Sequence, residues 1–229
     1  TPWPIFMIVL VALTYWGSRS IKLCVGTVLA FVFIGYFRMW EETMSTIAII
    51  LTSVIMSVAI GLPTGIAMSR SDRTQKIVTP ILDVMQTMPP FVYLIPIVML
   101  MGIGKIPGLI AVVIYAIPPL IRLTNLGIRQ VGKGFKEAGS SLGLTKFLIL
   151  IKIEIPLSLK TIMAGVNQTL MLALSMVVIA ALIGAGGLGL TVYIALGRLD
   201  VGSAVIGGTG IVILAIILDR ITQKIVKTR

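Results

Sequence analysis

The fold is decided first by residues 44–68, which read MSTIAIILTSVIMSVAIGLPTGIAM and carry no charged side chain. A helix needs roughly 20 apolar residues to cross the hydrocarbon core of a bilayer. The chain on either side repeats this pattern, and the uncharged run 161–197 is expected to be divided by the glycine-rich segment 184–189. The other candidate spans are residues 3–18, 23–37, 77–101, 106–121 and 201–218. We predict an all-α polytopic membrane protein with about seven transmembrane helices.

The composition excludes several classes of protein. Apolar residues make up 57% of the 229 residues and charged residues 12%, whereas soluble domains carry about 25% charged residues. This balance excludes a soluble enzyme, a disordered chain and a disulfide scaffold. The chain has no histidine and one cysteine, Cys24, which excludes nearly every ordinary zinc, haem or iron–sulfur site and histidine-based catalysis. We predict no metal site and no enzymatic activity.

The basic residues indicate the orientation, because cytoplasmic loops of membrane proteins collect Lys and Arg. If residue 1 lies outside and seven helices cross the membrane, the C-terminus lies in the cytoplasm. The 19 Lys and Arg residues then all fall on the cytoplasmic side except Arg38, Lys105 and Arg198. This asymmetry also explains the net charge of +11 without a nucleic-acid partner.

The longest cytoplasmic connection comprises residues 122–160. Residues 135–142 can form one helical piece, which Gly143 would end in a left-handed conformation. A second, amphipathic piece follows, with apolar residues of 147–155 among Lys146, Lys152 and Glu154, and Pro156 is expected to stop it. The spacing predicts helix, turn and helix, an element that can dock into a groove of a partner. The alternative is a solvated basic loop that serves only topology.

The spacing within this loop resembles a known signature. Glu137-Ala138-Gly139, three residues, Gly143, nine residues and Ile153-Glu154-Ile155-Pro156 resemble the EAA signature of binding-protein-dependent ABC importer permeases. That signature reads E-A-A, three residues, G, nine residues and I-x-L-P, so Gly139 and Ile155 are conservative departures. Four further stretches resemble the permease of the glycine betaine/proline-type osmoprotectant importer: residues 82–104, 165–189, 197–202 and 210–223.

The resemblance covers most of residues 42–223 and implies a type I ABC importer fold, with five core helices. Residues 1–41 would add two generic N-terminal helices, and residues 224–229 a cytoplasmic tail. The family likeness implies a homodimer of permeases, two cytoplasmic ATPase subunits and an extracytoplasmic substrate-binding protein, in the cytoplasmic membrane of a prokaryote. The solute would be glycine betaine, proline or a related quaternary amine. Residues expected to couple the chain to the ATPase are Glu137, Ala138, Gly139, Gly143, Ile153, Ile155 and Pro156.

No Walker A motif occurs in the chain, so ATP and Mg²⁺ are expected on the partner ATPase. The run Gly184 to Gly189 fits G-x-G-x-x-G, but it follows a membrane helix rather than the strand that a dinucleotide site needs. It is expected to allow close packing or a re-entrant bend. An ion-coupled secondary transporter remains the alternative function, although intramembrane ionisable groups are scarce.

Polar residues and prolines inside the spans are candidates for the translocation path or its gate. Asp83 has two interpretations, a path group or an inner-end carboxylate satisfied by water or by a basic neighbour such as Lys76, and its depth favours the second. Prolines within a span remove helical hydrogen bonds and favour kinks. A tight aromatic cage is not expected on this chain. The candidates are Asp83, Gln86, Pro89, Pro90, Tyr93, Asn167 and Gln168.

Overall fold

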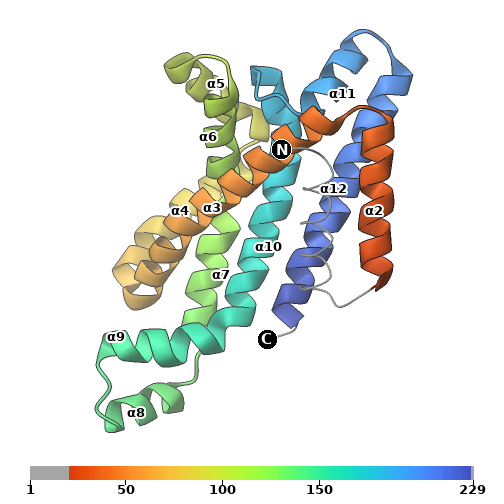
Figure 1. The fold of residues 1–229 in the computed structure, drawn as a ribbon. Coiled ribbons are helices and arrows are strands. Elements are labelled where there is room, and N and C mark those ends of the chain that lie inside the picture. Colours follow the sequence, from red (N-terminus) through yellow and green to blue (C-terminus); the bar gives the residue numbers. More distant parts are fainter. Residues whose placement is uncertain (1–20, 228–229) are drawn as a thin grey trace.

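A computed structural model describes residues 21–227, and every regular element among them is helical. The helices, shown in Figure 1, are α2 (Ile21–Tyr36), α3 (Trp40–Arg70), α4 (Asp72–Thr87), α5 (Pro90–Met101), α6 (Lys105–Ala116), α7 (Pro118–Arg129), α8 (Lys133–Ser141), α9 (Lys146–Ile149), α10 (Ile155–Ala180), α11 (Leu188–Gly197) and α12 (Val201–Lys227). A π-helical turn, Leu150–Glu154, joins α9 to α10. The all-α prediction is confirmed, while the predicted span 3–18 lies outside the described residues.

Within this described part, four helices are long and apolar enough to cross a membrane. They are Trp40–Arg70, Lys105–Arg129, Lys146–Ile183 and Val201–Thr222. The pair α4 and α5 makes a fifth if the two helices count as one span. The apolar part of α2, Val25–Tyr36, is shorter.

The predicted span 77–101 is broken. Helices α4 and α5 meet at an angle of 101°, with Pro89 between them and Pro90 as the first residue of α5. Proline has no N–H to continue the helix and disfavours helical geometry in the residue before it. The tandem prolines therefore end α4, and the kink predicted within this span is confirmed at Pro89 and Pro90.

The predicted span 106–121 is longer in the structure and runs from Lys105 to Arg129. Pro118 and Pro119 do not end it, because they occupy the first turn of α7, where a missing N–H costs no helical bond. The cytoplasmic connection is correspondingly shorter than residues 122–160. Its first eight positions belong to α7, and residues 155–160 are the first turns of α10.

Helix α7 lies at the centre of the bundle and packs most extensively against α10 and α3. Small residues make these contacts close. Gly61 and Gly65 of α3 face α7, and a Cβ added to Gly65 would lie 2.6 Å from the Cβ of Thr124 and 2.8 Å from the carbonyl oxygen of Ile121. This spacing of two glycines four positions apart is typical of membrane helices whose backbones approach closely.

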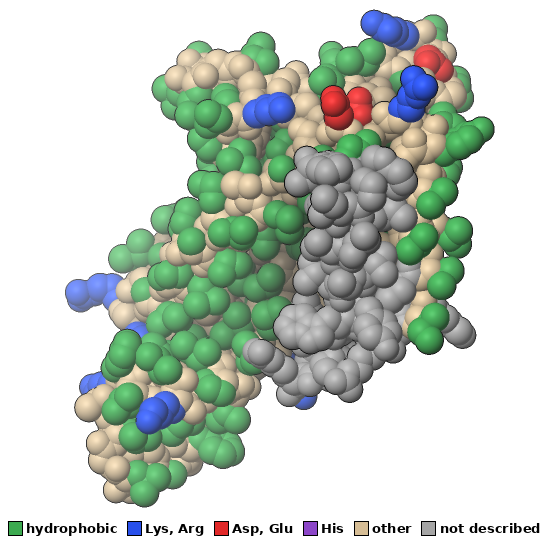
Figure 2. Space-filling view, in the orientation of Figure 1, with side chains coloured by type: hydrophobic (Ala, Val, Ile, Leu, Met, Phe, Trp, Pro, Cys, Tyr) green, Lys and Arg blue, Asp and Glu red, His purple; other side chains and the backbone are tan. Residues whose placement is uncertain are grey.

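The two ends of the bundle have different elements. Helices α8 and α9 lie at one end, toward which α12 also descends, and α5 and α11 lie at the other (Figure 1). On the face that Figure 2 shows, acidic side chains lie at the end with α5 and α11, Lys and Arg lie there and along the lower left, and hydrophobic side chains cover most of the described surface between. This distribution is typical of a protein whose middle faces hydrocarbon.

The glycine run 184–189 lies at the end opposite α8. It ends α10, as predicted, because Gly184 adopts φ of 80° after the short helical turn Ala181–Ile183. Gly187, with φ of 75°, approaches α3 so closely that an added Cβ would lie 2.4 Å from Oγ1 of Thr46. The same Thr46 oxygen accepts a hydrogen bond from the N–H of Leu188 at 2.9 Å. The run therefore permits close packing of α11 against α3.

Candidate functional site

The predicted helix–turn–helix is present as a hairpin of α8, a glycine turn and α9, hereafter the hairpin (residues 133–149). The N–H of Leu144 donates to the carbonyl of Gly139 and that of Gly143 to the carbonyl of Ser140, both at 3.0 Å. With Gly143 at φ of 75°, these bonds form a Schellman motif. Thr145 caps α9, since its Oγ1 accepts from the N–H of Leu148 at 3.4 Å.

One face of the hairpin is closed and the other is open. Gly139 is buried, and a Cβ there would lie 2.7 Å from Cδ1 of Ile153. Glu137 and Ala138, which precede Gly139, are exposed. Three large apolar side chains of the hairpin are also exposed: Phe135, Leu142 and Phe147 are 59%, 81% and 67% exposed. The hairpin is thus a small packed unit that leaves Glu137 and several large apolar side chains exposed.

Pro156 does not stop the second helix, contrary to the sequence-based prediction. The helix continues from Lys146 to Ile183, and Pro156 lies in the first turn of α10. The preceding π-helical turn explains this, because the N–H of Ile155 bonds to the carbonyl of Leu150, five residues earlier. The wider turn avoids the regular α-helical pattern, in which the proline ring would meet the carbonyl four residues before it.

Glu154 is the residue that sequence reasoning misplaced. We expected it on a polar helix face with Lys146 and Lys152, but its side chain is only 1% exposed. Its Oε2 pairs with the guanidinium of Arg70 at the end of α3. Its Oε1 lies 3.0 Å from Nζ of Lys136 in α8. The only sequence signal was a single carboxylate inside the apolar run 147–159.

A second ionic group joins the ends of α3, α4 and α7. Arg129, the last residue of α7, pairs with Asp72 of α4 at 2.7 Å. Its guanidinium also donates to the carbonyl of Met68 at 2.8 Å and to Oδ1 of Asn125 at 3.0 Å. Nζ of Lys136 lies 3.5 Å from the carbonyl of Ile128. Three cations and two carboxylates therefore tie the hairpin and three helix ends together.

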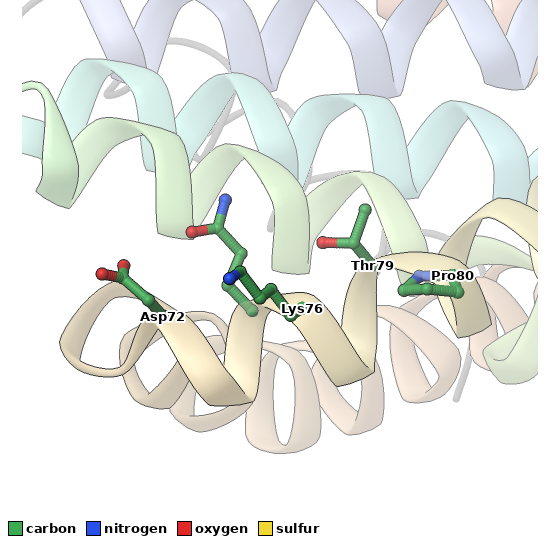
Figure 3. A pocket seen from close by; sticks show the side chains of 5 residues that line it. Asp72, Lys76, Thr79 and Pro80 are labelled. Carbon is green, nitrogen blue, oxygen red and sulfur yellow. The ribbon is translucent and has the colours of Figure 1, made fainter.

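Asp83 has a basic partner, which agrees with its interpretation as an inner-end carboxylate satisfied by a neighbour. The partner is not Lys76, however. Its carboxylate pairs with the guanidinium of Arg122 in α7. Lys76 instead lines a shallow groove of about 510 Å³ with Asp72, Gln75, Thr79 and Pro80. Figure 3 shows Asp72, Lys76, Thr79 and Pro80 along one side of α4. The pair of Asp83 and Arg122 connects the broken α4–α5 element to the central helix.

We expect Asp83→Asn to lower the free energy of unfolding by less than about 1 kcal/mol, because partly exposed ion pairs contribute little. Both side chains are accessible, at 55% for Asp83 and 37% for Arg122. The measurement is the thermal unfolding midpoint in detergent, with Lys76→Gln as the control that should leave it unchanged. A shift larger for Lys76→Gln than for Asp83→Asn would contradict the observed pairing.

The other path candidates do not gather into one site. Tyr93 is buried and donates its hydroxyl to the carbonyl of Met85 across the α4–α5 bend. Gln86 is exposed on α4. Asn167 donates to Oδ1 of Asp219 at 3.3 Å and accepts from the hydroxyl of Thr222 at 2.7 Å, which joins α10 to α12. Gln168, its neighbour, is exposed. Tyr93 and Asn167 therefore form their hydrogen bonds in different parts of the bundle, so these path candidates do not make one site.

At the opposite end, a pocket of about 330 Å³ lies between α3 and α11. Its lining includes Glu42, Thr191, Arg198 and Asp200. Hydrogen bonds from the hydroxyl and N–H of Ser203 hold the pKa of Asp200 below its usual range. The carboxylate therefore caps the start of α12. Over the residues that the structure describes, no group of His, Cys, Asp or Glu could hold a metal ion.

Comparison with known proteins decides the family. Residues 57–229 match the family described as binding-protein-dependent transport system inner membrane component. The chain belongs to this family. The glycine betaine/proline betaine transport system permease protein ProW of Salmonella typhimurium is 53% identical over 218 residues, which are 95% of this chain and 62% of that protein. The glycine betaine/carnitine transport permease protein GbuB of Listeria monocytogenes is 49% identical over 225 residues, 97% of this chain and 79% of that protein.

The chain spans less than two thirds of the ProW protein that it matches. Its fold can also be compared with a solved transporter structure. An inward-facing structure of the MetNI methionine ABC transporter superposes with a TM-score of 0.76 at 20% identity, covering 83% of this chain and 95% of that one. The fold is therefore that of a type I ABC importer permease. Membership in a binding-protein-dependent family favours an importer over the ion-coupled alternative, and it makes the chain an inner-membrane component of a transport system.

Proposed function

We propose that this chain is the permease subunit of an ATP-driven importer that moves a compatible solute of the glycine betaine type across the cytoplasmic membrane. The hairpin is the observation that carries the proposal. It is a closely packed unit outside the apolar bundle, and Glu137, Phe135 and Leu142 are all exposed on it. Large apolar side chains left exposed in this way are typical of a surface that binds a partner.

The partner of the hairpin is a cytoplasmic ABC ATPase, which binds ATP and Mg²⁺ and leaves this chain without a catalytic role. Two permease copies, two ATPases and an extracytoplasmic binding protein make the complex. The hairpin then faces the cytoplasm, and so does the end of α12, which lies toward the same end of the bundle (Figure 1). The outer position of residue 1 depends on the span 3–18 and remains a sequence-based prediction.

The solute assignment rests on the solutes that the relatives transport, which include glycine betaine, proline betaine and carnitine. More distant relatives transport trimethylamine N-oxide and choline, at 37% and 32% identity. These solutes share a methylated ammonium or amine oxide group. Tyr93 and Tyr115 meet edge to face with their ring centroids 6.1 Å apart, a geometry typical of packed aromatic pairs. Selection of the solute falls to the separate binding protein.

The test is uptake of radiolabelled glycine betaine into proteoliposomes that contain the permease, its ATPase and its binding protein. We expect uptake with ATP and none with a non-hydrolysable analogue or with an ATPase whose catalytic glutamate is changed. Uptake driven by an ion gradient without ATP would overturn the proposal. A panel of carnitine, choline, proline and trimethylamine N-oxide then ranks the solutes.

Docking of the hairpin has its own test in the same complex. Cys24 is the single cysteine, so Cys24→Ser gives a cysteine-free background. Ala138→Cys places a thiol on the exposed face of α8, and we expect a crosslink to the ATPase. Ile55→Cys, exposed in the middle of α3, is the control that should give none. A crosslink from position 55 but not from 138 would contradict the proposed contact.

A further inference from the structure

We propose that Glu154 is a positioning residue that couples the hairpin to the spans. One of its carboxylate oxygens binds α8 of the hairpin, and the other binds the C-terminal end of α3. This inference rests on the proposed function. Glu154 occupies the variable position x in the I-x-L-P end of the EAA signature, so the signature itself assigns it no role. Oε2 pairs with Arg70 and Oε1 with Lys136, so each oxygen serves a different element. Removing the carboxylate disconnects both at once.

Burial explains why this link is firm. The Glu154 side chain is 1% exposed, whereas its partners Arg70 and Lys136 are 37% and 34% exposed. A buried carboxylate is costly unless charged donors satisfy it, so its geometry is held by both cations together. A surface ion pair of the same length would be loosened by water and salt.

The π-helical turn places the carboxylate where both cations meet it. Glu154 is the last residue of that turn, and α10 begins at the next residue. A π-helical turn holds one more residue than an α-helical turn, so it offsets the side chains of α9 from those of α10. One oxygen of Glu154 can thereby face the hairpin while the other faces α3.

The link continues from α3 into the centre of the bundle. Arg129 of α7 donates to the carbonyl of Met68, two residues before Arg70. It also pairs with Asp72, two residues after Arg70. Helix α7 in turn packs along α10 and α3. A displacement of the hairpin therefore reaches α3 through Glu154 and the central helix through the end of α3.

The test compares Glu154→Gln with Glu41→Gln, the same chemical change at the exposed opposite end of α3. Uptake of glycine betaine and ATP hydrolysis are measured in the same proteoliposomes. We expect uptake per ATP hydrolysed to fall on the order of tenfold for Glu154→Gln, a size typical of residues that carry coupling. Glu41→Gln should leave the ratio unchanged. A merely structural defect would lower the amount of complex and both rates together, with an unchanged ratio.

Two further variants keep the inference testable if Glu154→Gln does not accumulate in the membrane. Lys136→Met removes one of the two cations and should lower the same ratio, whereas Arg70→Lys keeps the charge at the end of α3 and should retain most of it. A wild-type ratio for Lys136→Met or Glu154→Gln overturns the inference while uptake by the unaltered complex still supports the proposed function. Absence of ATP-dependent uptake by the unaltered complex would instead overturn the proposed function.

Discussion

Gly143→Pro abolishes uptake while the protein still inserts into the membrane: this is the largest functional effect that we expect. Gly143 adopts φ of 75°, and proline fixes φ near −65°. The substitution also removes the N–H that bonds to the carbonyl of Ser140 at 3.0 Å. The combined cost is about 3 kcal/mol or more, so the turn cannot close and α8 leaves its place against Ile153.

The matched control is Gly143→Asn, because asparagine tolerates the left-handed conformation better than other side chains. No atom lies within 4 Å of a Cβ added at this position, so the asparagine side chain has room. Uptake should be largely kept in this variant and lost in the proline variant, measured at equal membrane content. Equal uptake by the two variants would show that the turn plays no part in coupling.

The largest effect on stability is expected for Gly65→Leu. An added Cβ would already lie 2.8 Å from the carbonyl oxygen of Ile121, a backbone atom of α7. Backbone cannot move aside as a flexible side chain can, and overpacking of a well-packed contact costs about 1–3 kcal/mol or more. We expect α3 and α7 to separate, which removes the central contact of the bundle.

Thermal unfolding midpoints in detergent and the fraction of monodisperse protein measure this effect. Gly208→Leu is the matched control, since Gly208 lies in a helix of a membrane span but has no atom within 4 Å of an added Cβ. The control should keep its midpoint, and Gly65→Ala should fall between it and Gly65→Leu. A larger loss at position 208 than at position 65 would contradict the close approach of α3 and α7.

The sequence could predict what depends on neighbours along the chain. Long uncharged runs give membrane helices regardless of what surrounds them, because a helix satisfies its own backbone in hydrocarbon. Gly143 was predicted as a left-handed helix end, and the structure places it there with φ of 75°. The tandem prolines marked the place where α4 gives way to α5. Each of these features is set by conformational preferences within a few residues.

The tertiary structure decided the pairings between distant residues. Arg70 and Glu154 are 84 positions apart and Asp83 and Arg122 are 39 apart, so no local pattern could show that they meet. The same holds for the length of α7, which begins at Pro118 and Pro119 and continues past the predicted span end at residue 121 to Arg129. It also holds for Glu154, whose carboxylate is buried rather than solvated because two cations from other helices reach it. The sequence alone determined which segments are apolar enough to cross the membrane and that the loop between two of them resembles the EAA signature. Both depend on hydropathy and backbone preference, which are local properties. Packing alone decided that Glu154 meets Arg70 and Lys136, since a buried charge is stable only where the folded chain brings its partners to it.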